Sequence, residues 1–352
     1  MSTKNPENFL AILKEVDNGI INKINGAENS MEIKEKIITK KLFAGICAVG
    51  LLISGCGSEK ISEPVAIEQA QIFAEIIDDA GRKIILQQKP TRIVVTSASF
   101  LEPLNAVGGV IVGRPDSKNK MPDWAKDLPS VGAVYQIDME RLLSCAPDLV
   151  IINKGMNEKL LPVLEENKIP AIVVELKTYE DFKRGLKIFS TISGDVEAGD
   201  KIIADMDTEI KSIVDKVPKK NLRVAILHST AQGLSVQLDG SIAGSIVKMF
   251  GWENVASGMT PLEKNPDAAP YSMETLAEQN PEIIFVTSMG DLDEIKANMN
   301  KAISENAAWQ TIGAIKDNRL YFLPQDLFLL SPGLRYPEAV KTMAKLIYPD
   351  KF

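Results

Sequence analysis

Residues 139–151 read MERLLSCAPDLVI, and residues 273–285 read METLAEQNPEIIF. Each stretch predicts a short amphipathic helix, a proline that ends it, and a buried strand of Leu, Val, Ile or Phe. The number of residues from the glutamate to the proline is the same in both copies. This doubled unit indicates two similar lobes, each with an acidic helix start at a matching place.

Two glutamates, Glu140 and Glu274, fall in the first turns of the predicted helices. Asp138 and Ser272 stand just before them, where helix N-caps belong. An acid in a first turn is favoured by the helix dipole and is usually only a solvated cap. The two glutamates stand at the same position in both copies, which favours a second interpretation. In this interpretation both carboxylates bind basic sites on a two-fold symmetric partner.

The length and composition indicate a soluble protein of two lobes. A chain of 352 residues is too long for one ordinary core, and its content of 45% hydrophobic and 25% charged residues is typical of globular proteins. The net charge is −7 and the body of the chain contains no basic cluster, so nucleic acid is not expected as a partner.

The N-terminal part is predicted not to belong to the fold. A lysine-rich segment, an apolar run at 42–53 and then Cys56 resemble a bacterial lipoprotein signal peptide at 31–55, with Cys56 as the lipidated residue. The alternative is an uncleaved membrane anchor. Residues 1–30 are expected to be a mis-called extension, and residues 56–72 a linker. Cleavage would leave Cys145 as the only other cysteine, so no disulfide is expected.

Strands alternating with helices predict an α/β fold with mainly parallel sheets. A hairpin is expected at 73–86, and a helical pattern runs from 178 to 216 with a break at Gly194. We expect two Rossmann-like lobes, at 73–194 and 219–352, joined by a single long bridging helix at 195–218, with a ligand cleft between the lobes. The alternative for residues 195–218 is one more surface helix. Further strands are predicted at 92–95, 110–113, 149–152, 171–174, 223–227, 283–287 and 321–324.

The order of these segments resembles the substrate-binding lipoproteins of ABC importers, in the class with a rigid helical bridge. The resemblance covers residues 73–350 and is carried by the loop at 92–100, LPSVG at 128–132, the first copy of the doubled unit and SPGLR at 331–335. It implies a cleft for a siderophore, haem or cobalamin. It also implies docking of Glu140 and Glu274 into arginine pockets of a permease dimer that works with an ATPase.

Tyr135 is the residue most directly suggested by related haem binders, in which a Tyr or Met at this place ligates iron. Phenolate oxygen suits ferric iron, and Tyr135 is therefore the one candidate metal ligand, for haem or ferric iron only. Tyr271 lies just before the second copy and is expected to be the counterpart of Tyr135 on the other side of the cleft. The alternative for both rings is that they only cover apolar surface.

Other cargo contacts are expected at the ends of strands and on one loop. His228 is the only histidine and follows a predicted strand; a structural role is the alternative. One histidine does not make the His-carboxylate cluster that holds bare Zn²⁺ or Mn²⁺. Met121 is a further possible wall of the cleft. The remaining candidates are Ser97, Ser99, Trp124 and Arg335, of which Arg335 could neutralise a carboxylate of the cargo. A structural role at a helix start is the alternative for Arg335, and a core role is the alternative for Met121 and Trp124.

These features together predict a monomeric, lipid-anchored protein on the extracytoplasmic face of the membrane. It would have no cofactor of its own and would carry haem or a ferric siderophore, with cobalamin as the alternative. A secreted lipoprotein hydrolase is the competing function. It is disfavoured because residues 240–244, GSIAG, lack the G-x-S-x-G frame, and no enzyme activity is expected.

Overall fold

The computed structural model describes residues 72–117, 121–230 and 233–352, which belong to one compact unit, 68–352. The predicted signal peptide, Cys56 and all of the linker except Ile72 lie outside the described residues. The first described element is a hairpin of β1 (Ala74–Ile77) and β2 (Lys83–Leu86). Asp78 caps its turn by accepting hydrogen bonds from the backbone of Ala80 and Arg82.

The described residues contain two larger sheets, both α/β in character. The first has the strand order β6-β5-β4-β3-β7-β8, and only the pair β5–β6 is antiparallel. β3 and β8 are buried along their whole length and β7 in all but its last residue, as expected for parallel strands covered on both faces. The strands are β3 (Ile93–Val95), β4 (Ile111–Asp116), β5 (Ser130–Ala133), β6 (Gln136–Ile137), β7 (Leu149–Asn153) and β8 (Ala171–Val174).

The second sheet has the order β12-β10-β9-β13-β14, and β11 also pairs with β9. β9, β11, β13 and β14 are parallel, whereas β10 and β12 form an antiparallel edge. The strands are β9 (Arg223–Thr230), β10 (Gly233–Gln237), β11 (Glu253–Asn254), β12 (Ala268–Pro270), β13 (Ile283–Ser288) and β14 (Leu320–Phe322).

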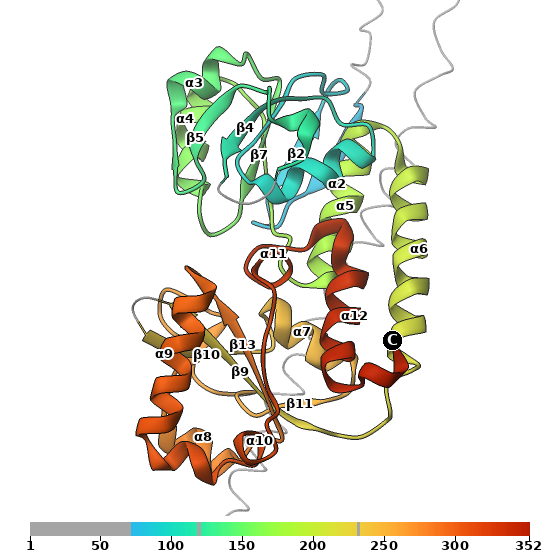
Figure 1. The fold of residues 1–352 in the computed structure, drawn as a ribbon. Coiled ribbons are helices and arrows are strands. Elements are labelled where there is room, and N and C mark those ends of the chain that lie inside the picture. Colours follow the sequence, from blue (N-terminus) through green and yellow to red (C-terminus); the bar gives the residue numbers. More distant parts are fainter. Residues whose placement is uncertain (1–71, 118–120, 231–232) are drawn as a thin grey trace, which may run out of the picture. The chain divides into compact units, whose positions relative to one another are not determined.

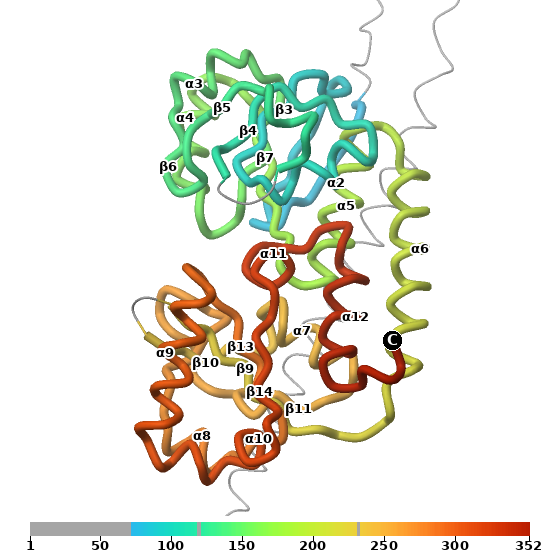
Figure 2. The backbone as a smooth tube through the Cα atoms, in the orientation of Figure 1, coloured from blue at the N-terminus to red at the C-terminus, as the bar shows by residue number. Residues whose placement is uncertain are grey.

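Two consecutive helices lead from the first sheet to the second, and the last α-helix of the chain packs on them. α5 (Tyr179–Ser193) ends at Gly194, which has a left-handed φ of 70°, and α6 (Val196–Val214) then passes from the first sheet to the second. α12 (Tyr336–Ile347) packs along α6, as Figures 1 and 2 show. The remaining α-helices are α2 (Leu101–Ala106), α3 (Met139–Ser144), α4 (Leu161–Glu166), α7 (Ile242–Met249), α8 (Met273–Gln279), α9 (Leu292–Glu305), α10 (Gly313–Lys316) and α11 (Gln325–Phe328).

The doubled unit of the sequence has the same structure in both copies. Asp138 caps α3 by accepting from the backbone N–H of Glu140, and Ser272 caps α8 by accepting from that of Thr275. The residue before each proline, Ala146 or Asn280, has a left-handed backbone with φ of 45° or 41°. Both helices therefore end with the same turn before the following strand.

The correspondence extends to the start of the central strand in each sheet. Asp148 accepts a hydrogen bond from the backbone N–H of Arg92 at 2.9 Å, and its own N–H donates to the carbonyl of Arg92 at 3.0 Å. Glu282 makes the same two contacts with Arg223, at 3.1 and 2.8 Å. The acid after each proline thus ties the strand of the doubled unit to the neighbouring strand, β3 or β9.

One hydrophobic cluster runs through both sheets and the helices between them. It contains Val95 and Ile151 from the first sheet and Ile226 and Phe285 from the second. Tyr336 of α12 is fully buried in it, with its ring 5.3 Å from the ring of Tyr179 and 6.1 Å from that of Phe182. These aromatic contacts therefore join the last α-helix of the chain to α5.

Candidate functional site

A cavity of about 580 Å³ lies at the carboxyl ends of β3 and β4, the position at which open α/β sheets bind ligands. The connections after these strands supply one wall, and the segment after β14 supplies the other. The residues that line these walls include Ser99, Glu102, Met121, Asp326, Ser331 and Arg335. The cavity therefore combines segments that are more than 200 positions apart in the sequence, and it has both polar and apolar sides.

Ser97 and Ser99 have different places at this site. Ser97 is buried, and its hydroxyl accepts a hydrogen bond from the backbone N–H of Ser99 at 3.3 Å, which caps the 3₁₀ turn Ala98–Phe100. Ser99 itself lines the cavity. The predicted loop at 92–100 thus contains a capped turn that presents Ser99, and not Ser97, to the cavity.

Arg335 lines the opposite wall, and two carboxylates bind its guanidinium. Its Nε and Nη2 donate to the two carboxylate oxygens of Glu338 at 2.6 and 2.8 Å, and its Nη1 donates to Asp326 at 2.9 Å. The hydrogen bonds with Glu338 raise the pKa of Arg335, and the same contact lowers the pKa of the Glu338 carboxyl. The positive charge of Arg335 is therefore compensated within the protein.

A second cavity, of about 260 Å³, lies at the carboxyl ends of β9 and β13 beside α9. Ser229 and Leu234 line it from the β9–β10 side, and Met289 lines it from the end of β13. The Met289 side chain is 50% exposed, although methionine is usually buried. The only signal for Met289 in the sequence is its place directly after a buried strand.

Gln325 links the two cavities through its side-chain amide. Its Nε2 donates to the hydroxyl of Ser288 at 3.1 Å and to the carbonyl of Gly290 at 2.9 Å. Gly290, which lines the second cavity, follows Met289, while the residue after Gln325 is Asp326 of the first cavity. The start of α11 is thereby fastened to the loop that carries Met289.

The other aromatic candidates do not line either of these two cavities. Tyr135 lies in the turn between β5 and β6 and is 70% exposed, and Trp124 is exposed on the 3₁₀ turn Asp123–Ala125. Tyr271 is half-buried: its hydroxyl donates to the sulfur of Met273, and its ring stacks on Trp309 with a centroid distance of 6.3 Å. Burial raises the pKa of Tyr271 to about 12, so the phenol is neutral at pH 7.

His228 lies near the end of β9 and is held by the neighbouring strand. Its Nδ1 is 2.9 Å from the hydroxyl of Thr287, and burial lowers the pKa of the imidazole. The ring is therefore neutral at pH 7, and one of its nitrogens is already engaged. Among the described residues no group of three or more His, Cys, Asp or Glu is arranged to hold a metal ion.

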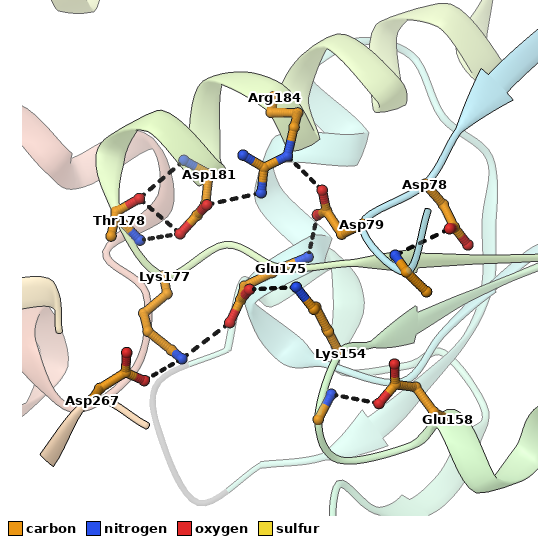
Figure 3. A network of polar contacts seen from close by, with 12 residues as sticks. Asp78, Asp79, Lys154, Glu158, Glu175, Lys177, Thr178, Asp181, Arg184 and Asp267 are labelled. Carbon is orange, nitrogen blue, oxygen red and sulfur yellow. Dashed lines mark hydrogen bonds and ion pairs between the residues drawn. The ribbon is translucent and has the colours of Figure 1, made fainter. Parts of the chain in front are cut away.

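A chain of ion pairs crosses from the first sheet to the second (Figure 3). Glu175, just after β8, binds Lys154 at 3.2 Å and Lys177 at 3.0 Å. Lys177 also pairs with Asp267, which precedes β12. The carbonyl of Lys177 accepts a hydrogen bond from the hydroxyl of Tyr336. The connection from β8 to α5 is thus bound both to the second sheet and to α12.

Glu140 and Glu274 are both exposed in the first turns of α3 and α8. Neither glutamate forms an ion pair with another described residue. Within the described part of the chain, the two carboxylates thus have no cation partner. No helix in the described part of the chain is long and apolar enough to cross a membrane.

The fold and the cavity at the strand ends define a two-sheet solute-binding protein. Residues 93–327 match the family model described as periplasmic binding protein, and the chain belongs to that family. Members of this family work with the permease and ATPase components of ABC importers.

Individual relatives are similar at a modest level of identity. "Uncharacterized ABC transporter substrate-binding lipoprotein YvrC" of Bacillus subtilis (strain 168) is 23% identical over 324 residues, which cover 88% of this chain and 98% of YvrC. "High-affinity heme uptake system protein IsdE" of Staphylococcus aureus (strain MRSA252) is 24% identical over 266 residues, 74% of this chain and 88% of IsdE. The crystal structure of an ABC transporter substrate-binding protein from Listeria monocytogenes EGD-e superposes with a TM-score of 0.66 at 25% identity, covering 74% of this chain and 100% of that one.

Proposed function

We propose that this protein captures an iron complex, haem or a ferric siderophore, on the extracytoplasmic side and delivers it to the permease of an ABC importer. The observation that carries the proposal is the cavity of about 580 Å³ at the strand ends in a member of the periplasmic binding protein family. Cavities of roughly 300–1,000 Å³ are the size that buries most of a compact small molecule. Cobalamin, larger than haem, is the alternative cargo.

The similarity to IsdE, whose name states heme uptake, supports a test of haem first. Tyr135 is the proposed iron ligand, because phenolate oxygen suits ferric iron. Its exposed ring lies outside the lining of both cavities, so the cargo would have to extend to the turn between β5 and β6. Adding haemin to the purified protein should shift the Soret band if haem is the cargo. Tyr135→Phe should then alter that spectrum, and an unchanged spectrum would remove the ligand assignment.

Binding of the three cargo classes is measured on the same sample. Ferric siderophores and cyanocobalamin are titrated while the fluorescence of the tryptophans is followed, and any co-purifying cargo is identified by mass spectrometry. A dissociation constant below about 10 μM for one class would support the proposal. Failure of all three classes to bind would refute it. We propose no catalytic activity, because His228 is held by Thr287 and lies outside the lining of both cavities.

We propose that Glu140 and Glu274 dock on the two halves of the permease. Two observations support this docking role. The two glutamates hold equivalent positions in the two copies of the doubled unit, and both are exposed and form no ion pair with a described residue. Changing both to Ala should leave cargo affinity unchanged and reduce uptake more than about tenfold, since such contacts govern encounter and specificity. Glu278→Ala, an exposed acid on the same helix as Glu274, is the matched control. Normal uptake by the double variant would contradict the docking role.

We further propose a lipid anchor at Cys56, a monomeric state, and a division into lobes at 73–194 and 219–352 around a bridge at 195–218. The anchor is supported by the sequence around Cys56 and by the word lipoprotein in the name of YvrC. Metabolic labelling with a radioactive fatty acid should mark the wild-type chain and not Cys56→Ala. Equal labelling of the two chains would exclude Cys56 as the acylated residue.

A further inference from the structure

We infer that Asn157 is a positioning residue for cargo binding, which holds Tyr135 and Met156 as two parts of one contact face for the macrocycle of a tetrapyrrole. This inference rests on the proposed function and narrows the cargo from metal chelates in general to tetrapyrroles. It is carried by one buried side chain that joins two turns and by the two exposed side chains that these turns present. We call Tyr135 and Met156 the edge pair.

The Asn157 side chain is buried, and only one end of its amide is paired. The residue is 0% exposed, although asparagine is mostly found at the surface. Its Nδ2 donates to the carbonyl of Val134 at 2.7 Å, whereas its Oδ1 has no hydrogen-bond partner among the described residues. A buried amide oxygen without a donor lowers the stability of a fold. The burial of Asn157 is therefore better explained by the turn that it fixes than by a gain in stability.

The hydrogen bond joins two turns that the sheet itself does not pair. Val134 lies in the turn from β5 to β6, and Asn157 lies in the turn after β7. In the first sheet β4 and β3 stand between β5 and β7, and these four strands are parallel. Both turns therefore lie at the carboxyl edge of the sheet, where the larger cavity also lies. The Asn157 amide thus fixes one segment to another at the edge where open α/β sheets bind ligands.

Each of the two turns presents one large side chain to solvent. Tyr135 directly follows the acceptor of this hydrogen bond and is 70% exposed, and Met156 directly precedes its donor and is 46% exposed. The turn of Met156 is also held on its other side, where the N–H of Gly155 donates to the carboxylate of Glu158 at 3.0 Å. Two exposed side chains of this size at one sheet edge, fixed by hydrogen bonds of their turns, favour a binding face.

The chemistry of the edge pair favours a tetrapyrrole. A thioether is polarisable and apolar, and a phenol joins an aromatic ring to one polar group, so both pack on a conjugated macrocycle through dispersion. The polar surface of a trihydroxamate chelate needs hydrogen-bond partners, and a thioether is only a weak acceptor. Neither side chain lines the cavity of about 580 Å³, so the macrocycle would extend from that cavity along the sheet edge. Met156 would then pack on it beside the proposed iron ligand Tyr135.

The test measures the affinity of the purified full chain for haemin, cyanocobalamin and ferrichrome. Haemin and cyanocobalamin carry a tetrapyrrole macrocycle, and ferrichrome is a trihydroxamate. Met156→Ala truncates an exposed side chain and should weaken the binding of haemin or cyanocobalamin by about fivefold or more, while ferrichrome changes by less than about twofold. A loss for haemin alone identifies haem as the cargo, and a loss for cyanocobalamin alone identifies cobalamin. Unchanged affinity for both tetrapyrroles, or an equal loss for ferrichrome, would overturn the inference.

Asn157→Ala tests the positioning step. It should weaken tetrapyrrole binding about as much as Met156→Ala does. Asn167→Ala is the matched control, because Asn167 donates to the carbonyl of Val163 at the same distance of 2.7 Å and lies outside both turns. If Asn157 acts through the edge pair, the double variant Met156→Ala/Asn157→Ala should bind no more than about twofold more weakly than either single variant. Losses that multiply in the double variant, or an equal loss in Asn167→Ala, would overturn the positioning role. Asn157→Leu, which keeps the volume and removes the donor, replaces Asn157→Ala if that variant does not fold.

The same probes separate this inference from the proposed function. Binding of ferrichrome without either tetrapyrrole would overturn the inference and leave the proposed function standing. Failure of all three probes to bind would instead refute the proposed function. Normal tetrapyrrole affinity of Met156→Ala together with reduced uptake would show that the edge pair contacts the permease, which also overturns the inference.

Discussion

Replacing Asp267 by Asn tests whether the Lys177–Asp267 ion pair holds the first sheet to the second. The substitution keeps the shape and a hydrogen-bond acceptor and removes the charge. Lys177 would keep its contact with Glu175 at 3.0 Å, so the change isolates the link between the sheets. The fold should otherwise be retained, because the backbone carbonyl of Asp267 still accepts a hydrogen bond from Leu238 at 2.8 Å.

The burial of the two partners sets the expected magnitude. The side chain of Asp267 is 20% exposed and that of Lys177 is 36% exposed, so the pair is neither fully solvated nor dry. Exposed pairs contribute about 0–1 kcal/mol, and breaking a buried pair costs about 3–5 kcal/mol. We therefore expect Asp267→Asn to lower the free energy of unfolding by about 1–2 kcal/mol. For a chain of this size, this corresponds to a decrease in Tm of about 2–4 °C.

The assay is urea unfolding followed by circular dichroism, with thermal unfolding as a second measure. Asp205→Asn is the matched control, because Asp205 pairs with Lys201 on α6 and both side chains are more than 60% exposed. The control should change the free energy of unfolding by less than about 0.5 kcal/mol. Equal stability of Asp267→Asn and Asp205→Asn would show that the pair between the sheets contributes nothing beyond a surface contact.

Three further predictions concern the interior. A Cβ at Gly244 would lie 2.3 Å from the carbonyl oxygen of Leu238, so Gly244→Ala should destabilise the fold by about 1–3 kcal/mol in urea unfolding; an unchanged midpoint would contradict this. Burial lowers the pKa of His228, so the unfolded chain binds the proton more readily and stability should fall as pH decreases below about 6.5. His228→Gln should remove up to about 1 kcal/mol of that fall between pH 6.5 and 5.5, and parallel pH profiles would argue against it. Tyr336→Phe deletes the hydrogen bond to the carbonyl of Lys177 and should cost about 1 kcal/mol, with a wild-type Tm as the contrary result.

Local patterns were sufficient to predict the elements with strong periodicity. The doubled unit predicted α3 with β7 and α8 with β13, including the caps Asp138 and Ser272, because caps, prolines and buried strands are signalled within a few residues. The fold class was confirmed for the same reason. The antiparallel strands β10 and β12 were missed, since their pairing joins residues that are more than 30 positions apart.

Less of the candidate site than of the fold could be predicted from the sequence. Ser99, Met121 and Arg335 line the larger cavity, and their contact with a cargo stays a prediction. The contact of Arg335 with Asp326 could not be foreseen, because Asp326 is nine positions away on a separate helix, whereas Glu338 is only three positions away. Met289 was overlooked, because a methionine after a buried strand is ordinarily part of the core, and only the structure shows its exposure.

The burial of Tyr336 against α5 bears on protein engineering with this scaffold. The last helix of the chain completes the interior that the first sheet and α5 begin, so a fragment ending after α6 would leave Tyr179 and Phe182 uncovered. A chimaera that takes its cargo-binding half from a relative must therefore keep α5 and α12 from the same parent. Exchange of loops at the strand ends, which leaves this aromatic contact intact, is the safer route to a new specificity.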